Sequence, residues 1–240
     1  MNDRHDILPA GRHAPRWHTI LGWITLLAFV GAQATGFAIS APDRDMGHLQ
    51  KIMYVHVPAA WMAMIAFFVV FIVSLIYLWR RDERYDLLAA AAAEVGVVLT
   101  ALTLALGSIW GRATWGIWWT WDPRLTTTAI LLVIYAGYLA LRAFAEEPER
   151  RARWSAAVGI LGFLNVPIVY MSVRWWRTIH QVQSSPSTVD SAYVLGLRLN
   201  AIAFLLLFLY LLAIRYHASR AERVAEARLE EAALMGGIHV

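Results

Sequence analysis

The feature that most constrains this chain is a series of apolar stretches long enough to cross a lipid bilayer, which takes about 20 residues in a helix. Six stretches qualify, at about 18–40, 53–79, 87–109, 126–144, 155–173 and 192–214. Lipid offers backbone groups no hydrogen-bond partners, and none of the stretches alternates as a strand would, so each is expected to be a helix. The sequence therefore predicts an all-α, polytopic membrane protein with six transmembrane helices in one domain spanning residues 1–240.

The composition agrees with this class of protein. Of the 240 residues, 59% are apolar and only 16% are charged, against roughly a quarter charged in an ordinary soluble domain. A soluble protein of this size would expose large apolar patches. Cysteine is absent, which excludes disulfides, thiolate metal sites, iron–sulfur clusters and a cysteine nucleophile.

The basic residues indicate the orientation of the spans. Fourteen of the 21 Lys and Arg residues lie in the N-terminal segment, the turns after the second and fourth spans, and the C-terminal tail. The positive-inside rule places this set in the cytoplasm. Both termini are then cytoplasmic, and the loop between the third and fourth spans faces outward. Topology explains the basic excess, so no nucleic-acid partner is expected, only membrane lipid.

Three further predictions concern the end of the first span, the charged residue Glu94 and the C-terminal tail. The first span ends near Ala32-Gln33-Ala34, which resembles a signal-peptidase site, but the apolar stretch continues past it and we expect an uncleaved helix. Glu94, in the third span, is either tolerated near the membrane edge or pairs with a neighbouring subunit. The tail at 216–240 is expected to form a short amphipathic cytoplasmic helix.

Tryptophan is concentrated in the outer loop that begins at Trp110 and leads to the fourth span. Five of the twelve tryptophans lie there, and Trp175 and Trp176 add two after the fifth span. An interfacial aromatic belt explains one or two per helix end, whereas five in one loop indicate a platform for a large flat ligand. The loop is either a short helix or an irregular platform held by glycine and Pro123. As a helix, it would present on one face Trp115, Trp118, Trp119 and Asp122.

Two histidines lie at the same membrane level as this loop. His56 is at the outer end of the second span, and His180 follows the fifth. Two neutral imidazoles from separate helices, facing an aromatic platform, are what a six-coordinate haem iron requires. His48 lies in a polar loop and is the weaker candidate. Asp122 and Arg124 would form polar interactions, either with each other or with ligand carboxylates.

Residues 115–126 read WGIWWTWDPRLT. They resemble the signature WGxWWxWDxRLT of the haem-handling proteins of cytochrome c maturation and match it at every fixed position. With six spans and one flanking histidine on each side, the chain resembles the CcmC family, also called haem exporter protein C. The larger haem-lyase relatives have many more spans.

The resemblance implies a haem-binding and transfer protein rather than an enzyme, with haem b held at the outer, periplasmic face of the bacterial inner membrane. His56 and His180 match the axial ligands of the family. The remaining site residues implied are Trp115, Gly116, Trp118, Trp119, Trp121, Asp122 and Arg124. Arg174 and Arg177 are further candidates for binding the haem propionates.

The family presents haem to a periplasmic chaperone, CcmE, for covalent attachment. It associates with an ABC module formed by CcmA and CcmB and with the small membrane protein CcmD. This chain has no G-x-x-x-x-G-K-[ST] loop, so an ATPase step would lie in a partner.

Two other classes of function compete with haem transfer. A b-type haem electron-transfer subunit would also use helix histidines, but such subunits bury their ligands within the spans, and no histidine lies near a span centre. A small-molecule transporter would need a polar path, and beyond Glu94 and Asn165 the spans offer few polar residues.

Overall fold

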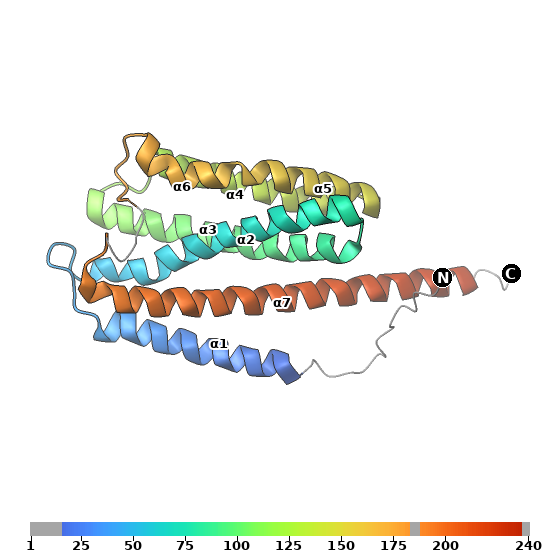
Figure 1. Cartoon of the computed structure of the whole chain (residues 1–240), viewed down its shortest axis with the longest axis horizontal. Helices are drawn as coiled ribbons and strands as arrows, with labels where there is room; N and C mark the ends of the chain where they lie inside the picture. The colour runs from blue at the N-terminus through green and yellow to red at the C-terminus, as the bar shows by residue number, and fades with distance from the viewer. Residues whose placement is uncertain (1–15, 183–187, 237–240) are drawn as a thin grey trace.

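The computed structural model describes residues 16–182 and 188–236, and within them it is a helical bundle without β-strands (Figure 1). The expected cytoplasmic positions of residues 1–15 and 237–240 fall outside the described part. The elements are α1 (Arg16–Ala34), η1 (Thr35–Ile39), η2 (His48–Ile52), α2 (Met53–Arg80), α3 (Glu83–Trp115), α4 (Pro123–Phe144), α5 (Pro148–Phe163), α6 (Asn165–Trp175) and α7 (Ser191–Gly236). They form six membrane-length segments, which confirms the prediction of six helical spans.

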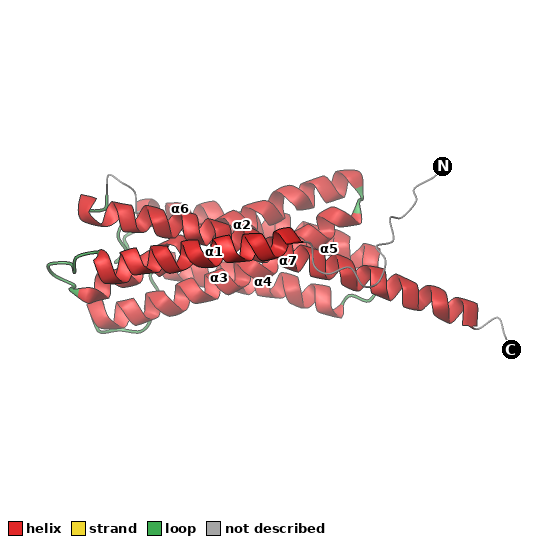
Figure 2. Cartoon of the chain, turned by 90° about the horizontal axis from the view of Figure 1, so that it is seen from below, coloured by secondary structure: helices red, strands yellow, loops and turns green. Residues whose placement is uncertain are grey.

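An antiparallel hairpin of α2 and α3 forms the centre of the bundle. The α4, α5 and α6 helices pack on one side of it and α7 on the other, while α1 packs mainly on α7 (Figures 1 and 2). Phe67 of α2 stacks on Tyr135 of α4 with ring centroids 3.7 Å apart. The Tyr135 hydroxyl donates to the Gly159 carbonyl of α5 at 3.1 Å, so one buried ring joins three helices.

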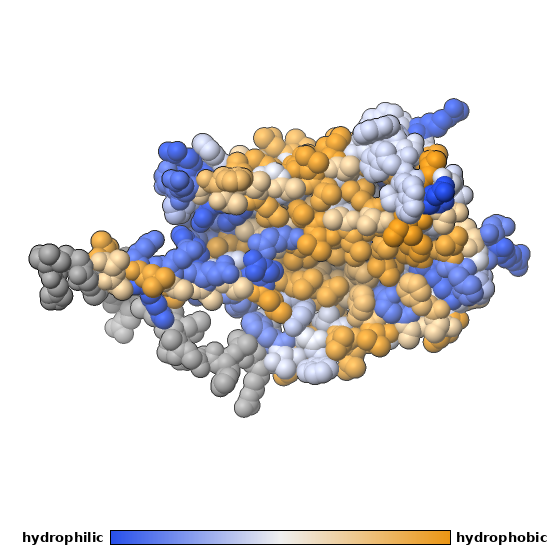
Figure 3. All heavy atoms as spheres, turned by 180° about the vertical axis from the view of Figure 1, so that it is seen from behind, coloured by the Kyte–Doolittle hydropathy of each residue, from blue (hydrophilic) through white to orange (hydrophobic). Residues whose placement is uncertain are grey.

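The face of the bundle seen in Figure 3 is largely apolar between two more hydrophilic ends. Leu27 on α1 and Val133 on α4, for example, are each about 70% exposed. In a soluble protein such side chains would normally be buried. A large exposed apolar surface of this kind, on helices long enough to cross a bilayer, indicates contact with lipid. The chain is therefore a multi-pass membrane protein.

The fifth span is broken into two helices. α5 ends at Phe163 and α6 starts at Asn165, two residues before Pro167, which has no N–H to donate to the preceding turn. The Asn165 side-chain amide donates to the Thr127 carbonyl of α4 at 2.8 Å. α5 packs against both α2 and α4, whereas α6 packs mainly against α4. The break thus carries the second half of the span away from α2.

Two predicted helix boundaries are wrong. α3 continues to Trp115, so Trp110 is helical and the loop begins only at Gly116. The tail is not a separate short helix, because α7 runs unbroken from Ser191 to Gly236 and contains no proline. Apolar length locates the lipid-facing part of a helix but gives no signal where polar residues continue it.

The Glu94 carboxylate forms an ion pair with Arg215 of α7 in the same chain. A second pair joins Arg223 of α7 to Glu83, the first residue of α3, at 2.7 Å. Both pairs hold the polar continuation of α7 against α3. The sequence alone predicts a tolerated charge near the membrane edge or a contact with another subunit. It does not predict a partner in the same chain, because Arg215 lies 121 positions away in the sequence.

The end of α1 is tied to α7 by a buried amide. The Asn200 side chain is fully buried, donates to the Ala32 carbonyl at 3.0 Å and accepts from the Gln33 side chain at 2.7 Å. Cleavage after Ala34 would separate α1 from the rest of the chain. Retention of this helix stays a prediction.

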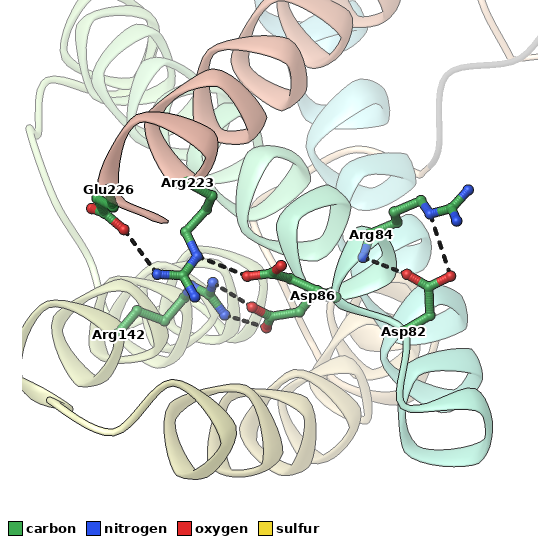
Figure 4. Close-up of polar contacts among 7 residues, drawn as sticks. Asp82, Arg84, Asp86, Arg142, Arg223 and Glu226 are labelled. Atoms are coloured by element: carbon green, nitrogen blue, oxygen red, sulfur yellow. Dashed lines mark hydrogen bonds and ion pairs between the residues drawn. The ribbon is translucent and has the colours of Figure 1, made fainter. Parts of the chain in front are cut away.

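At the end where α2 joins α3, Arg142 of α4 forms two hydrogen bonds to the Asp86 carboxylate, at 2.5 and 2.8 Å (Figure 4). Both side chains are almost completely buried, with exposures of 12% and 7%. Breaking a buried pair leaves an uncompensated charge and costs about 3–5 kcal/mol. The pair therefore fixes α3 against α4.

We expect Asp86→Ala to lower the free energy of unfolding by about 3–5 kcal/mol. The matched control is Glu147→Ala, which removes the exposed Arg150–Glu147 pair at 3.1 Å and should change stability by less than about 1 kcal/mol. Denaturant unfolding in detergent, followed by tryptophan fluorescence, measures both. Equal small changes would contradict the assigned role of the buried pair.

Candidate functional site

A cavity of about 230 Å³ opens at the end of the bundle where α3 ends and α4 begins, which we call the site end. Its walls come from α2, α3, α4 and α6, and it is covered by residues 117–120 and 179–182. The deeper wall is apolar, with Ala63, Leu104 and Leu131 among its residues. The cavity therefore combines an apolar interior with an aromatic and polar entrance, as ligand sites commonly do.

His56 enters this cavity from the first turn of α2. Its ring is buried and lies edge-on to Trp110 of α3, with centroids 5.9 Å apart. A Cβ at Gly107 would lie 3.1 Å from His56 Cε1, so the absent side chain leaves room for the imidazole. The Nδ1 atom has no hydrogen-bond partner among the described residues. A buried imidazole with an unused nitrogen is costly unless a ligand completes it.

The tryptophan-rich segment is an irregular platform, because residues 116–122 contain no helix; the alternative of a short helix is wrong. Gly116 ends α3 in the left-handed conformation, with φ +77°, and its N–H donates to the Arg112 carbonyl at 3.1 Å. Arg112 donates in turn to the Gly116 carbonyl. The Ser108 hydroxyl donates to the Trp118 carbonyl at 2.8 Å, which folds the platform back onto α3.

The tryptophans of the motif differ in whether they line the cavity. Trp115, Trp118 and Trp119 line the cavity. Trp121 is 81% exposed and lies outside the cavity lining, packing edge-on against Trp119 with centroids 5.8 Å apart. Trp121 can therefore support the platform or present a surface, but it does not bound the cavity.

Asp122 is a structural junction rather than part of the cavity wall. One oxygen caps α4 by accepting from the Arg124 backbone N–H at 2.9 Å. The other accepts from the Thr178 hydroxyl at 2.6 Å and the Ile179 N–H at 2.9 Å. Burial acts to raise the pKa of the Asp122 carboxyl, but these hydrogen bonds outweigh it and lower the pKa. The charged form therefore joins the start of α4 to the segment that follows α6.

His180 lies in that segment and lines the cavity. Its Nδ1 is 2.9 Å from the Gln181 carbonyl oxygen; an N–H at Nδ1 would donate to it and leave the lone pair of Nε2 available to a ligand. Burial lowers the pKa of His180 below its ordinary value, although the Gln181 carbonyl acts in the opposite direction. The imidazole is therefore held in its neutral, ligating form.

Arg124 contributes the only Lys or Arg side chain to the cavity lining in the part of the chain that the structure describes. Its guanidinium donates to the Ser172 hydroxyl at 3.3 Å and the Tyr170 carbonyl at 3.1 Å. Arg174 and Arg177 are exposed and lie outside the lining. A planar cation at the cavity can bind a ligand carboxylate.

The structure thus divides the residues singled out from the sequence into two groups. Lining one cavity are His56, His180, Trp115, Trp118, Trp119 and Arg124. Gly116, Trp121 and Asp122 lie outside its lining and shape or support its entrance. Thr178, Ser172 and Ser108 were missed, because an isolated hydroxyl carries no sequence signal until its distant partner is known.

These features define a class of protein: a multi-pass helical membrane protein with a histidine-flanked aromatic cavity at one membrane face. A family model described as heme exporter protein C matches residues 10–231. The chain belongs to this haem exporter protein C, or CcmC, family.

Individual proteins of this family are also similar in sequence to the chain. Heme exporter protein C of Bradyrhizobium diazoefficiens is 40% identical over 204 residues, covering 82% of this chain and 77% of the relative. The protein of the same name in Escherichia coli K12 is 34% identical over 201 residues, covering 80% and 82%. A putative cytochrome c biosynthesis ccmC-like mitochondrial protein of Marchantia polymorpha is 37% identical over 147 residues, covering 61% of each chain.

The left-handed cap at Gly116 can be tested by adding a Cβ. Gly116→Ala places a side chain at φ +77° and should lower the free energy of unfolding by about 1–2 kcal/mol. Gly137→Ala is the control, because a Cβ there meets no atom within 4 Å; its stability should be unchanged or higher. Similar losses in both variants would show that the cap does not require glycine.

Proposed function

We propose that this protein binds haem b in the cavity, with His56 and His180 as axial ligands, and presents it to the chaperone CcmE during cytochrome c maturation. Membership of the haem exporter protein C family supports haem handling. The observation that carries the assignment is that one cavity is lined by both histidines and by three tryptophans of the motif, Trp115 at the end of α3 and Trp118 and Trp119 of the platform. The protein is a haem-delivery subunit, and haem is its cargo.

The residues present fit a haem. The Nδ1 atom of His56 has no hydrogen-bond partner among the described residues, and the contact of the His180 Nδ1 with the Gln181 carbonyl leaves the His180 Nε2 for iron. When bound, the haem supplies an iron that takes two axial ligands and a vinyl edge that can be attacked. The indole faces of the platform give broad contact to a macrocycle at low entropic cost, and the open side of the cavity leaves an edge accessible to a partner.

Arg124 is the proposed partner of a haem propionate. It lines the cavity, whereas the earlier candidates Arg174 and Arg177 do not. Its bonds to Ser172 and Tyr170 hold the guanidinium in place before a ligand arrives. A preorganised cation loses less side-chain entropy on binding a carboxylate.

The site end is proposed to face the periplasm from the bacterial inner membrane. The basic turns at the opposite end, including Arg80 and Arg142, support this orientation through the positive-inside rule. CcmA, CcmB and CcmD are the proposed partners, and the sequence lacks the phosphate-binding loop of an ATPase. A single domain over residues 1–240 remains part of this proposal.

Replacing either axial histidine tests the assignment. His56→Ala and His180→Ala should each convert the absorption spectrum of the purified protein from six-coordinate low-spin to five-coordinate haem, because one iron ligand is lost. His48→Ala is the matched control: His48 is an exposed histidine near the same end, outside the cavity lining. Retention of the wild-type spectrum and haem yield in both cavity variants would exclude axial ligation by these residues.

The propionate role of Arg124 can be isolated by changing the ligand as well as the protein. The wild type should bind haem at least about tenfold more tightly than haem dimethyl ester, since a hydrogen bond to a charged group contributes about 1.5–3 kcal/mol. Arg124→Gln should remove most of this preference, while Arg174→Gln should keep it. A preference unchanged by Arg124→Gln would place the propionates elsewhere.

A further inference from the structure

The two cavity histidines have different mechanical supports. His56 is part of α2, so the regular helix fixes the position of its backbone. His180 lies beyond the end of α6, where residues 176–182 form no helix. Its position therefore depends on hydrogen bonds that reach this irregular segment from elsewhere in the chain.

Thr178 provides the central bond of that segment. Its hydroxyl donates to the Asp122 carboxylate at 2.6 Å and accepts from the His180 backbone N–H at 3.0 Å. The same carboxylate oxygen accepts from the Ile179 N–H at 2.9 Å. Hydrogen bonds to an ionised acceptor are shorter and stronger than neutral ones. The Asp122 carboxylate thus holds this segment at two points: directly at the Ile179 N–H, and through the Thr178 hydroxyl at the His180 N–H.

Further hydrogen bonds join the start of α4 to α6, the helix that precedes the His180 segment. Asn165 bonds the Thr127 carbonyl, and Arg124 bonds Ser172 and the Tyr170 carbonyl. All of them connect the first turns of α4 with α6. The start of α4, α6 and the His180 segment therefore form one unit, which faces the α2–α3 hairpin and His56 across the cavity.

We propose that Thr178 is a positioning residue for His180: its hydroxyl transmits the placement of Asp122 to the histidine backbone and so sets the reach of the imidazole toward the iron. The inference rests on the proposed function, because it assigns a role in haem ligation. Thr178 does not line the cavity, so its effect on the ligand is exerted through His180.

The test compares Thr178→Val, which keeps the shape but removes the hydroxyl, with Thr178→Ser, which keeps the hydroxyl. Loss of an outer-shell partner of a metal ligand typically costs about 10–100-fold in affinity. Thr178→Val should therefore show a high-spin, five-coordinate haem fraction and take up added imidazole at about tenfold lower concentration than the wild type. Thr178→Ser should match the wild type.

A double variant separates positioning from general damage. In a His180→Ala background, Thr178→Val should change neither the spectrum nor the imidazole affinity further, because the group it positions is absent. Asp122→Asn, which removes the charge at nearly constant size, provides a second approach should Thr178→Val fail to fold. It should weaken His180 ligation in the same direction.

The inference is overturned if Thr178→Val and Thr178→Ser have the same spectrum and imidazole affinity, or if the effect of Thr178→Val persists in the His180→Ala background. Should Thr178→Val not fold, a wild-type spectrum in Asp122→Asn overturns it as well. Failure of the proposed function looks different: the wild-type haem spectrum would then be insensitive to both His56→Ala and His180→Ala.

Discussion

The structure depends on one constraint, the absence of hydrogen-bond partners for backbone and polar groups inside a bilayer. The spans satisfy their backbones as helices, and three of the polar side chains within them join one helix to another. Asn200 joins α7 to α1, Tyr135 joins α4 to α5, and Asn165 joins α6 to α4. Each bond gives the buried group a partner and also fixes the packing of two helices.

The two ends of the bundle use their charges differently. At the end away from the cavity, ion pairs join one helix to another: Asp86 with Arg142, Glu94 with Arg215, and Glu83 with Arg223. At the site end, the Asp122 carboxylate is taken up by a helix cap and two donors, so its hydrogen bonds go to backbone and hydroxyl groups rather than to the Arg124 guanidinium. Arg124 therefore remains a cation at the cavity whose charge is available to a ligand.

The site is assembled from two supports. The α2–α3 hairpin provides His56 and, through Ser108 and Arg112, the platform. The other unit, built from the start of α4 and α6, provides Arg124 and His180. A ligand that binds both histidines would bridge these supports, so binding would be coupled to the distance between them. This arrangement suits the proposed function, in which the protein both holds haem and releases it.

The sequence alone determined the six spans, because apolar length is a local property that a bilayer tests directly. It also determined the neighbourhood of the site, since the tryptophan-rich motif and the two histidines sit at the ends of successive spans. It could not determine where α3 and α7 end, since polar residues continue a helix without a local signal. The packing of the helices determines that Glu94 pairs with Arg215, that Asp122 supports the cavity rather than lining it, and that Thr178 contacts both Asp122 and His180. Those outcomes depend on contacts between residues more than 50 positions apart, which follow from helix packing and leave no periodic trace in the chain.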